Sequence, residues 1–353
     1  MIHSWLISVI ILMHNKLSLT ARCLQSLAPA LAGFDHEVIL LDNGSIHDTG
    51  LLKEYGDAFG RFTLIRSDEN LSFSIGNNYC VNQSSGQKLL FLNNDVILRK
   101  GCIEHLIKPM TEDEETAATG GKLLFPGETS VQHAGISQML WDHPSNFGVG
   151  ACPDDERIND QRLCFALSGA MLCVDRSLFE SVHGFDERYV WGTEDIDLCL
   201  KIKAAGRKTV YCPEAVAVHY ESATLKDSNR RKSESNCSLY RKVWDPVLVP
   251  AELHYVHWLK SQNIYRVAVF GLGTAAKGLA RILDKSGIQI VAFTASDIET
   301  GGQSFLNRPA LPLAELKTLA YDRLLVATQY YFAVEPKIRE YDPLHEPIYP
   351  ILN

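Results

Sequence analysis

Short apolar runs alternate with helical patterns through the first hundred residues. Each run is nearly continuous in apolar side chains, as is typical of strands buried on both faces of a parallel sheet. Residues 17–31 carry apolar side chains along one helical stripe, and residues 51–59 and 76–84 allow further helices. Strands that alternate with helices predict an open, parallel α/β sheet. The four runs are residues 8–12, 37–41, 62–65 and 88–92.

After residue 117 the pattern becomes irregular, and it restarts near residue 265. The strand pattern at 266–270 is followed by Gly271-Leu-Gly-Thr-Ala-Ala276, a helical stretch to Ser286 and further strand patterns at 287–293 and 323–327. We therefore predict a first domain over residues 1–246, a linker over 247–263 and a smaller Rossmann-like domain over 264–353. In the irregular region we expect a strand at 163–174 interrupted at Ser168-Gly169, a helix at 194–205, strands at 208–212 and 216–219, and a helix at 229–244.

Polar residues gather where three of the first predicted strands end. The clusters are His14-Asn15, Asp42-Asn43-Gly44-Ser45 and Asn93-Asn94-Asp95. Ligands of open α/β sheets bind beyond the carboxyl ends of the strands, near the point where strand order reverses. These clusters therefore indicate a binding site at that edge.

Composition narrows the class of protein. The 353 residues are 46% hydrophobic and 22% charged with a formal charge of −8, which argues against a non-specific nucleic-acid binder. The nine cysteines are scattered and contain no Cys-x-x-Cys pair, which argues against a zinc knuckle and suits a reducing cytoplasm. The apolar run at 6–13 is too short to span a bilayer and lacks the features of a signal peptide. We expect a cytoplasmic protein.

Each candidate for chemistry also has a structural interpretation. The carboxylate of Asp95, with the amides of Asn93 and Asn94 beside it, suits a divalent cation. A polar turn without a metal explains these three residues better. The acids Glu194, Asp195 and Asp197 could supply a general base, or they complement the dipole at a helix N-terminus. His219 is a structural residue unless it faces Asp95. Gly169 allows either close approach of a ligand or a β-bulge.

The glycines of the second domain raise a different possibility. Gly271-x-Gly273-x-x-Ala276 follows a strand and opens a helix, as a dinucleotide fingerprint requires, and Asp297 ends the next strand. Such glycines also serve tight turns in Rossmann-like domains that bind nothing, and we favour that interpretation. The alternative function is an NAD-dependent oxidoreductase centred on Gly271 and Gly273.

The order of the motifs resembles glycosyltransferase family 2, nucleotide-sugar-dependent enzymes of the GT-A fold, and in particular its rhamnosyltransferase-like branch. The resemblance covers residues 8–244. It rests on Ser8-Val-Ile-Ile-Leu-Met-His-Asn15, Glu37-Val-Ile-Leu-Leu-Asp-Asn-Gly-Ser45, Asn70-Leu-Ser-Phe-Ser-Ile-Gly-Asn-Asn78, Phe91-Leu-Asn-Asn-Asp95, Ser168-Gly-Ala-Met171, Gly184-Phe-Asp-Glu187, Thr193-Glu-Asp-Ile-Asp-Leu198 and Val218-His219.

The resemblance implies roles for individual residues. Asp95 and His219 are expected to hold a divalent Mn or Mg ion, Asp195 to act as the catalytic base with Glu194 beside it, and Trp191 to lie near the acceptor. Three departures from the family pattern bear on recognition of the base. Asn93 stands in place of the first Asp of the metal motif. His14 stands where an aromatic residue is common, and Ser72 stands where Gly is common. The residues expected at the donor nucleotide sugar are His14, Asn15, Asp42, Asn70, Asn78, Asn93, Asn94 and Gly169.

The implied function is inverting, metal-dependent transfer of a sugar to a hydroxyl acceptor. The donor would be a nucleoside-diphosphate sugar, with dTDP or UDP as carrier, and the acceptor a saccharide or a lipid-linked saccharide. The setting would be the synthesis of a surface polysaccharide or glycolipid in the cytoplasm, at the inner face of the membrane. A catalytically silent binding scaffold is the third hypothesis. Membrane docking, homo-oligomer formation and the role of residues 264–353 stay open.

Overall fold

The chain divides into two compact units. A computed structural model describes residues 5–46, 49–140, 142–190, 192–220, 229–298, 303–341, 347–349 and 351–352. The N-terminal unit comprises Met1–Ile136 and Cys152–Tyr240, and the C-terminal unit comprises Ser137–Ala151 and Arg241–Asn353. This division differs from the predicted boundaries, because residues 137–151 make their contacts with the second unit.

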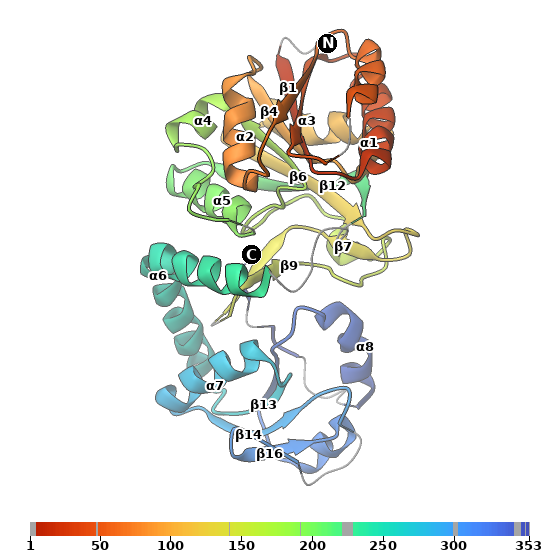
Figure 1. Cartoon of the computed structure of the whole chain (residues 1–353). Coiled ribbons are helices and arrows are strands. Elements are labelled where there is room, and N and C mark those ends of the chain that lie inside the picture. Colours follow the sequence, from red (N-terminus) through yellow and green to blue (C-terminus); the bar gives the residue numbers. More distant parts are fainter. Residues whose placement is uncertain are drawn as a thin grey trace. The chain divides into compact units, whose positions relative to one another are not determined.

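A mixed sheet forms the centre of the N-terminal unit (Figure 1). Its strand order is β10-β12-β6-β11-β4-β1-β2-β3, with β5 beside β12 and β7 beside β6. The prediction of an open α/β sheet is confirmed, but β11 runs antiparallel to both β4 and β6, so the sheet is not wholly parallel. The strands are β1 (Leu6–Met13), β2 (Asp35–Asn43), β3 (Phe62–Ser67), β4 (Lys88–Asn93), β5 (Val96–Leu98), β6 (Thr116–Leu124), β7 (Val131–His133), β10 (Arg162–Leu163), β11 (Met171–Asp175) and β12 (Lys208–His219).

Helices cover both faces of this sheet. Alternate residues of β1, such as Val9 and Ile11, share one core with apolar residues of α1 and α3. On the other face Phe91 of β4 packs against Phe179 and Phe185 near α4. Figure 1 shows α2, α4 and α5 together on one side of the sheet and α1 on the other. The helices are α1 (Leu17–Ala30), α2 (Phe73–Asn82), α3 (Cys102–Glu112), α4 (Arg176–Ser181) and α5 (Glu194–Ala204), with 3-10 helices η1 (Gly50–Ala58) and η2 (Glu156–Ile158).

Four predicted elements of this unit take a different form. Residues 50–58 form a 3-10 helix, since Gly50 and Gly56 favour an α-helix poorly. The strands predicted at 208–212 and 216–219 are one strand, β12, whose pairing with β6 is shifted between Cys212 and Val216. The strand predicted at 163–174 is confined to its two ends, β10 and β11.

The C-terminal unit contains a second, smaller sheet in the order β15-β16-β14-β13-β17. Strand β13 lies parallel to β14 on one side and to β17 on the other. Val267 and Val269 of β13 pack with Leu279 and Leu283 of α7 in its core. Helix α6 (Asn229–Ser261) begins in the N-terminal unit and continues into this one from Arg241. The other elements are β8 (Ile136–Met139), β9 (Pro144–Asn146), β13 (Arg266–Phe270), α7 (Thr274–Ser286), β14 (Gln289–Thr294), β15 (Gln303–Phe305), β16 (Arg308–Leu311), η3 (Leu313–Thr318), β17 (Arg323–Val326), α8 (Tyr331–Tyr341) and β18 (Ile351–Leu352).

The predicted linker over 247–263 is wrong, because helix α6 continues through it to Ser261. Pro246 and Pro250 lie inside the helix, and each removes a backbone donor. The helix persists because Val256 and Leu259 are buried in the core of the C-terminal unit. In the described part of the chain, no helix combines the length and the apolar character that a membrane crossing requires.

Candidate active site

A cavity of about 150 Å³ lies where β1, β2 and β4 end. Its walls include the predicted residues His14, Asn70, Asn93, Asn94 and Asp95, which come from three separate stretches of the chain. They meet because β1 pairs in parallel with both β2 and β4, so that the carboxyl ends of these strands share one edge. The strand-end clusters therefore meet at one cavity, and ligand binding there stays a prediction.

Asn43 also lines this cavity, although it is not among the predicted site residues. Its amide nitrogen donates to the Leu71 carbonyl at 2.9 Å and to Asn70 Oδ1 at 3.1 Å, and its Oδ1 accepts from the Leu71 backbone N–H at 2.8 Å. Asn43 thus ties residues 70–71 to the end of β2. The polar cluster Asp42-Asn43-Gly44-Ser45, which indicated Asp42, was also the sequence signal for Asn43.

Asp42 is completely buried beneath the surface of the cavity. Its Oδ1 accepts from the Ser45 backbone N–H at 3.0 Å, and its Oδ2 accepts from Thr49 Oγ1 at 2.6 Å and from Arg66 at 2.7 Å. Burial acts to raise the pKa of Asp42, but these hydrogen bonds outweigh it and hold the pKa below its usual value. In this conformation Asp42 secures the loop after β2, and its expected place at the donor nucleotide sugar stays a prediction.

The two residues after β1 fix the same loop from the other side. Asn15, in a left-handed conformation at φ +58°, donates its backbone N–H to Ser45 Oγ at 2.7 Å and accepts from the Ile46 N–H at 3.0 Å. His14 Nδ1 lies 2.9 Å from the Asn43 carbonyl. Asn15 therefore shapes the cavity without lining it.

Asp95 and His219 face each other at the end of β4. His219 Nε2 lies 3.2 Å from Asp95 Oδ1, and 10% of the His219 side chain and 16% of the Asp95 side chain are exposed. Asn93 Nδ2 is 3.5 Å from the same ring nitrogen. His219 comes from β12, more than a hundred residues away in sequence. It faces Asp95, as a role in metal binding requires, and that role stays a prediction.

These groups suit a divalent cation that a substrate helps to bind. A carboxylate oxygen and an imidazole nitrogen are both suitable donors for Mn²⁺. Within the described ranges, no cluster of three or more His, Cys, Asp and Glu side chains could hold a metal by itself. The fit is therefore to an ion whose remaining ligands are phosphate oxygens and water.

Asp195 lies in the first turn of α5 and is connected to Asn93 through residues 169–170. Its Oδ2 accepts from the Gly169 backbone N–H at 2.8 Å, and the neighbouring Ala170 carbonyl accepts from the Asn93 N–H at 2.9 Å. A Cβ added to Gly169 would lie 3.4 Å from that of Asp195 and 3.0 Å from the Phe73 ring. Gly169 thus permits the close approach of α5 to the residues preceding β11.

Glu194 is buried next to Asp195. Its Oε2 has no hydrogen-bond partner among the described residues. Burial, together with the neighbouring Asp195 carboxylate, raises the pKa of Glu194 to about 8, and burial raises the pKa of Asp195 as well. A raised pKa suits a group that takes up a proton near neutral pH.

Four of the residues predicted at the donor do not line the cavity: Asn15, Asp42, Gly169 and Asn78. The Asn78 side chain donates a hydrogen bond to the Phe185 carbonyl at 2.9 Å and accepts one from the Phe185 backbone N–H at 3.1 Å. It does not line the cavity. Its predicted contact with the donor stays a prediction. Trp191 lies outside the described residues.

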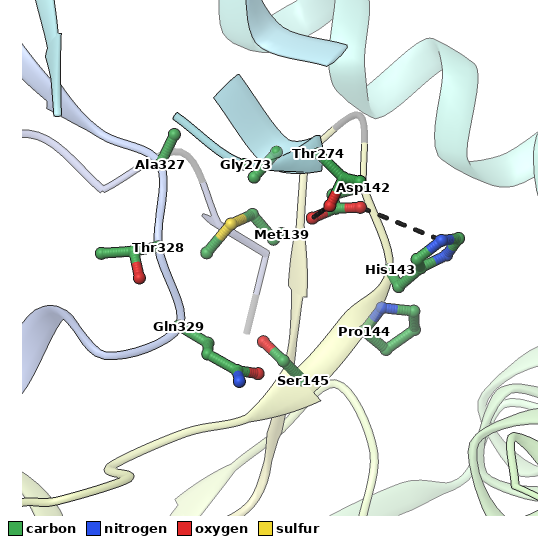
Figure 2. Close-up of a pocket in the computed structure, with 11 residues that line it drawn as sticks. Met139, Asp142, His143, Pro144, Ser145, Gly273, Thr274, Ala327, Thr328 and Gln329 are labelled. Atoms are coloured by element: carbon green, nitrogen blue, oxygen red, sulfur yellow. Dashed lines mark hydrogen bonds and ion pairs between the residues drawn. The ribbon is translucent and has the colours of Figure 1, made fainter. Parts of the chain in front are cut away.

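The C-terminal unit has its own cavity of about 310 Å³, at the ends of β13 and β17 (Figure 2). Gly273 and Thr274 line it, but Asp142 Oδ2 accepts from Thr274 Oγ1 at 3.1 Å at the first residue of α7. In dinucleotide-binding folds the pyrophosphate lies at this helix N-terminus. A carboxylate of the chain itself stands there instead, which disfavours the dinucleotide interpretation.

The remaining glycine of that fingerprint has a structural explanation. Gly271 adopts φ +117°, and a Cβ on it would come within 2.5 Å of the Ala327 carbonyl oxygen. It is required for the close packing of the ends of β13 and β17, not for a ligand. Gly273, in contrast, has open space around the position of a Cβ.

Comparison with known proteins agrees with the geometry of the N-terminal unit. Residues 8–160 match the model of glycosyl transferase family 2. These residues are a glycosyltransferase family 2 domain. Residues 165–222 match a galactosyltransferase model described as an N-terminal domain, and residues 263–345 match a model described as C2185-like, N-terminal.

Relatives of the family 2 domain include proteins named for polysaccharide synthesis. The O-antigen biosynthesis protein RfbC of Myxococcus xanthus is 29% identical over an alignment of 231 residues, and the match covers 62% of this chain and 18% of that protein. Rhamnosyltransferase WbbL of Escherichia coli is 30% identical over 139 residues, covering 37% of this chain and 52% of WbbL. The matched regions thus span only part of these relatives.

A solved structure shows the same fold. GalNAc-T7, crystallised with UDP, GalNAc and Mn²⁺, superposes with a TM-score of 0.54 at 17% identity and covers 68% of this chain and 48% of its own. The GT-A fold expected from the motifs is confirmed.

Proposed function

We propose that the family 2 domain transfers a sugar, with inversion, from a nucleoside-diphosphate sugar to a hydroxyl group of a saccharide or lipid-linked acceptor. The observation that carries the proposal is the facing pair of Asp95 and His219 at the strand-end cavity. Two hydrogen bonds through residues 169–170 connect Asp195 to Asn93, which lines the same cavity. The names of the relatives support surface-polysaccharide synthesis as the setting.

In this proposal Asp195 is the general base. Its carboxylate accepts the proton of the acceptor hydroxyl while that oxygen forms a bond to the anomeric carbon of the donor. The bond from the anomeric carbon to the phosphate oxygen breaks, and the nucleoside diphosphate leaves with the bonding electrons. One displacement inverts the anomeric centre and needs no covalent intermediate on the enzyme.

The hydrogen bond from the Gly169 N–H orients the carboxylate of Asp195. Because Asp195 Oδ2 accepts from the Gly169 N–H and its Oδ1 from the Ile196 N–H at 2.8 Å, the carboxylate has little freedom to rotate. Glu194, buried and protonated near neutral pH, adds no second negative charge beside it.

Asp95 and His219 would hold the divalent ion, which stabilises the charge that develops on the diphosphate. His14, Asn43 and Asn70 line the cavity where the nucleoside would bind. dTDP and UDP are the carriers we propose, since the matched motifs are those of the rhamnosyltransferase-like branch.

A panel of nucleotide sugars tests this function. With Mn²⁺ present, one donor at about 100 times its Kd is expected to stabilise the full chain by about 2.7 kcal/mol, and chelation of Mn²⁺ should abolish both this effect and sugar transfer. Asp95→Ala should remove the stabilisation, whereas Asp57→Ala, which changes an exposed carboxylate in η1, should preserve it. If no UDP-, dTDP- or GDP-sugar is bound, hydrolysed or transferred, the proposal is wrong.

A further inference from the structure

Gln132 is a buried polar residue next to His219. It lies in β7, which pairs with β6, and 3% of it is exposed. Leu124, the last residue of β6, pairs with Val131 on one side and with Val218 on the other. Because β12 runs parallel to β6, His219 stands just beyond the end of β6. Because β7 runs antiparallel to β6, Gln132 lies beside the last two residues of β6, at the register shift between the pairs Val131–Leu124 and His133–Leu123.

Two contacts define how the amide of Gln132 is oriented. Its Oε1 lies 2.8 Å from His219 Nδ1, and its Nε2 lies 3.5 Å from the His219 carbonyl oxygen. Turning the amide over would place two oxygen atoms, Oε1 and the carbonyl oxygen, against each other. In the favoured orientation Oε1 is an acceptor, so the Nδ1 atom of His219 carries a proton.

The proton on Nδ1 determines what the other side of the ring presents. In a neutral imidazole with Nδ1 protonated, Nε2 has a lone pair. That lone pair points to the side where Asp95 Oδ1 lies 3.2 Å away, and two such acceptors repel each other unless a positive charge lies between them. The arrangement is the one that two ligands of a common cation adopt.

We propose that Gln132 is a positioning residue that fixes the ring and tautomer of His219, so that Nε2 is the atom presented to the divalent ion. This inference rests on the proposed function. Histidines that bind metals generally donate their second ring N–H to a carboxylate or carbonyl acceptor, and loss of that acceptor typically lowers metal affinity about 10–100-fold. Here a neutral amide is the acceptor, so it adds no further negative charge beside Asp95.

Binding of Mn²⁺ to the full chain tests the proposal. Free Mn²⁺ is measured by electron paramagnetic resonance, with Mn²⁺ alone and with UDP or dTDP added. Electron spin-echo modulation by ¹⁴N then reports whether an imidazole nitrogen is bound to the ion. For the wild type we expect binding with ¹⁴N modulation, and for His219→Ala the loss of that modulation.

Gln132→Leu removes the acceptor at similar side-chain size. We expect Mn²⁺ affinity to fall about 10–100-fold and the ¹⁴N modulation to weaken. Gln132→Glu keeps an oxygen opposite Nδ1 and should restore both. Gln138→Leu is the matched control: Gln138 is also buried and donates to backbone carbonyls, but it lies in the C-terminal unit and should leave Mn²⁺ binding unchanged.

The outcomes separate this inference from the function on which it rests. If Gln132→Leu keeps wild-type affinity and ¹⁴N modulation, the positioning role is wrong while the cation site stands. If the wild type binds no Mn²⁺, both the site and the positioning role are wrong. Should Gln132→Leu fail to fold, Gln132→Asn replaces it, since its amide is one carbon shorter and is expected to weaken Mn²⁺ binding in the same way.

Discussion

Both units place polar residues at the carboxyl ends of parallel strands, but they use them differently. In the N-terminal unit, His219 Nε2 and Asp95 Oδ1 face each other at 3.2 Å, an arrangement that a cation would complete. In the C-terminal unit, Asp142 already accepts from Thr274 at the start of α7 (Figure 2). A polar strand end therefore indicates a site only where the chain leaves its polar groups incompletely satisfied.

The largest expected effect that tests this contrast is on Asp195. Asp195→Asn removes the base without changing its size, so kcat should fall about 10²–10⁴-fold while donor binding, measured by calorimetry, persists. Asp142→Asn makes the same chemical change in the C-terminal unit and should leave kcat unchanged. Near-wild-type turnover by Asp195→Asn would show that another group is the base.

Two glycines provide a second contrast between the units. In Gly169→Ala the new Cβ would lie 3.0 Å from Phe73, which forces residues 168–170 away from Asp195. Since misplacement by 1 Å can cost about 100-fold, we expect steady-state kcat to fall roughly 10-fold. Gly273→Ala meets nothing within 4 Å and serves as the control with unchanged kcat. Equal effects of the two variants would contradict the contrast.

The buried Glu194 predicts how stability depends on pH. Its pKa is raised from 4.5 to about 8 by burial and by Asp195, so between these values the folded state holds a proton that the unfolded state has released. The free energy of unfolding should therefore fall as pH rises from about 5 to 8. Glu194→Gln should flatten this slope in urea titrations, and Glu54→Gln, an exposed control, should not. Parallel curves for wild type and Glu194→Gln would refute the assignment.

The smallest expected effect concerns Asp142 itself. Loss of its charge in Asp142→Asn should lower the unfolding free energy of the C-terminal unit by about 0.5–1 kcal/mol, because an anion near the first turn of α7 stabilises the helix. Differential scanning calorimetry of the full chain measures this change. Titration of the wild type with NAD⁺ should give no binding heat, and a measured heat would break the contrast between the units.

The local pattern of apolar and polar residues was sufficient to predict the strands that end at the cavity. The apolar runs predicted β1, β2 and β4, and the polar clusters after them predicted His14 and Asp95 at one edge. The position of His219 depends on β12 pairing with β5 and β6, which only the family resemblance could suggest. Gln132 was not predicted, since its importance arises from a contact across 87 residues of sequence.

The errors came from tertiary contacts that override local preference. Residues 247–263 were predicted as a linker, but burial of Val256 and Leu259 keeps α6 helical through them despite Pro250. Residues 137–151 show no clear pattern in the sequence, and they join the C-terminal unit because Met139 and Leu140 are buried in its core. Asp42 follows a motif, yet its hydrogen bonds within the loop show a structural task that no motif records.

The assignment of residues 137–151 to the C-terminal unit has a practical consequence. Strand β18 pairs with Met139 and Gln138, so the C-terminal unit is assembled from segments on both sides of Cys152–Tyr240. A truncation after residue 246 would strip Met139 and Leu140 of their apolar neighbours and expose them to water. A chimaera that takes its C-terminal unit from a homologous gene would therefore also need the 15 residues 137–151 from that gene. A chimaera made with a single crossover lacks this match and should aggregate.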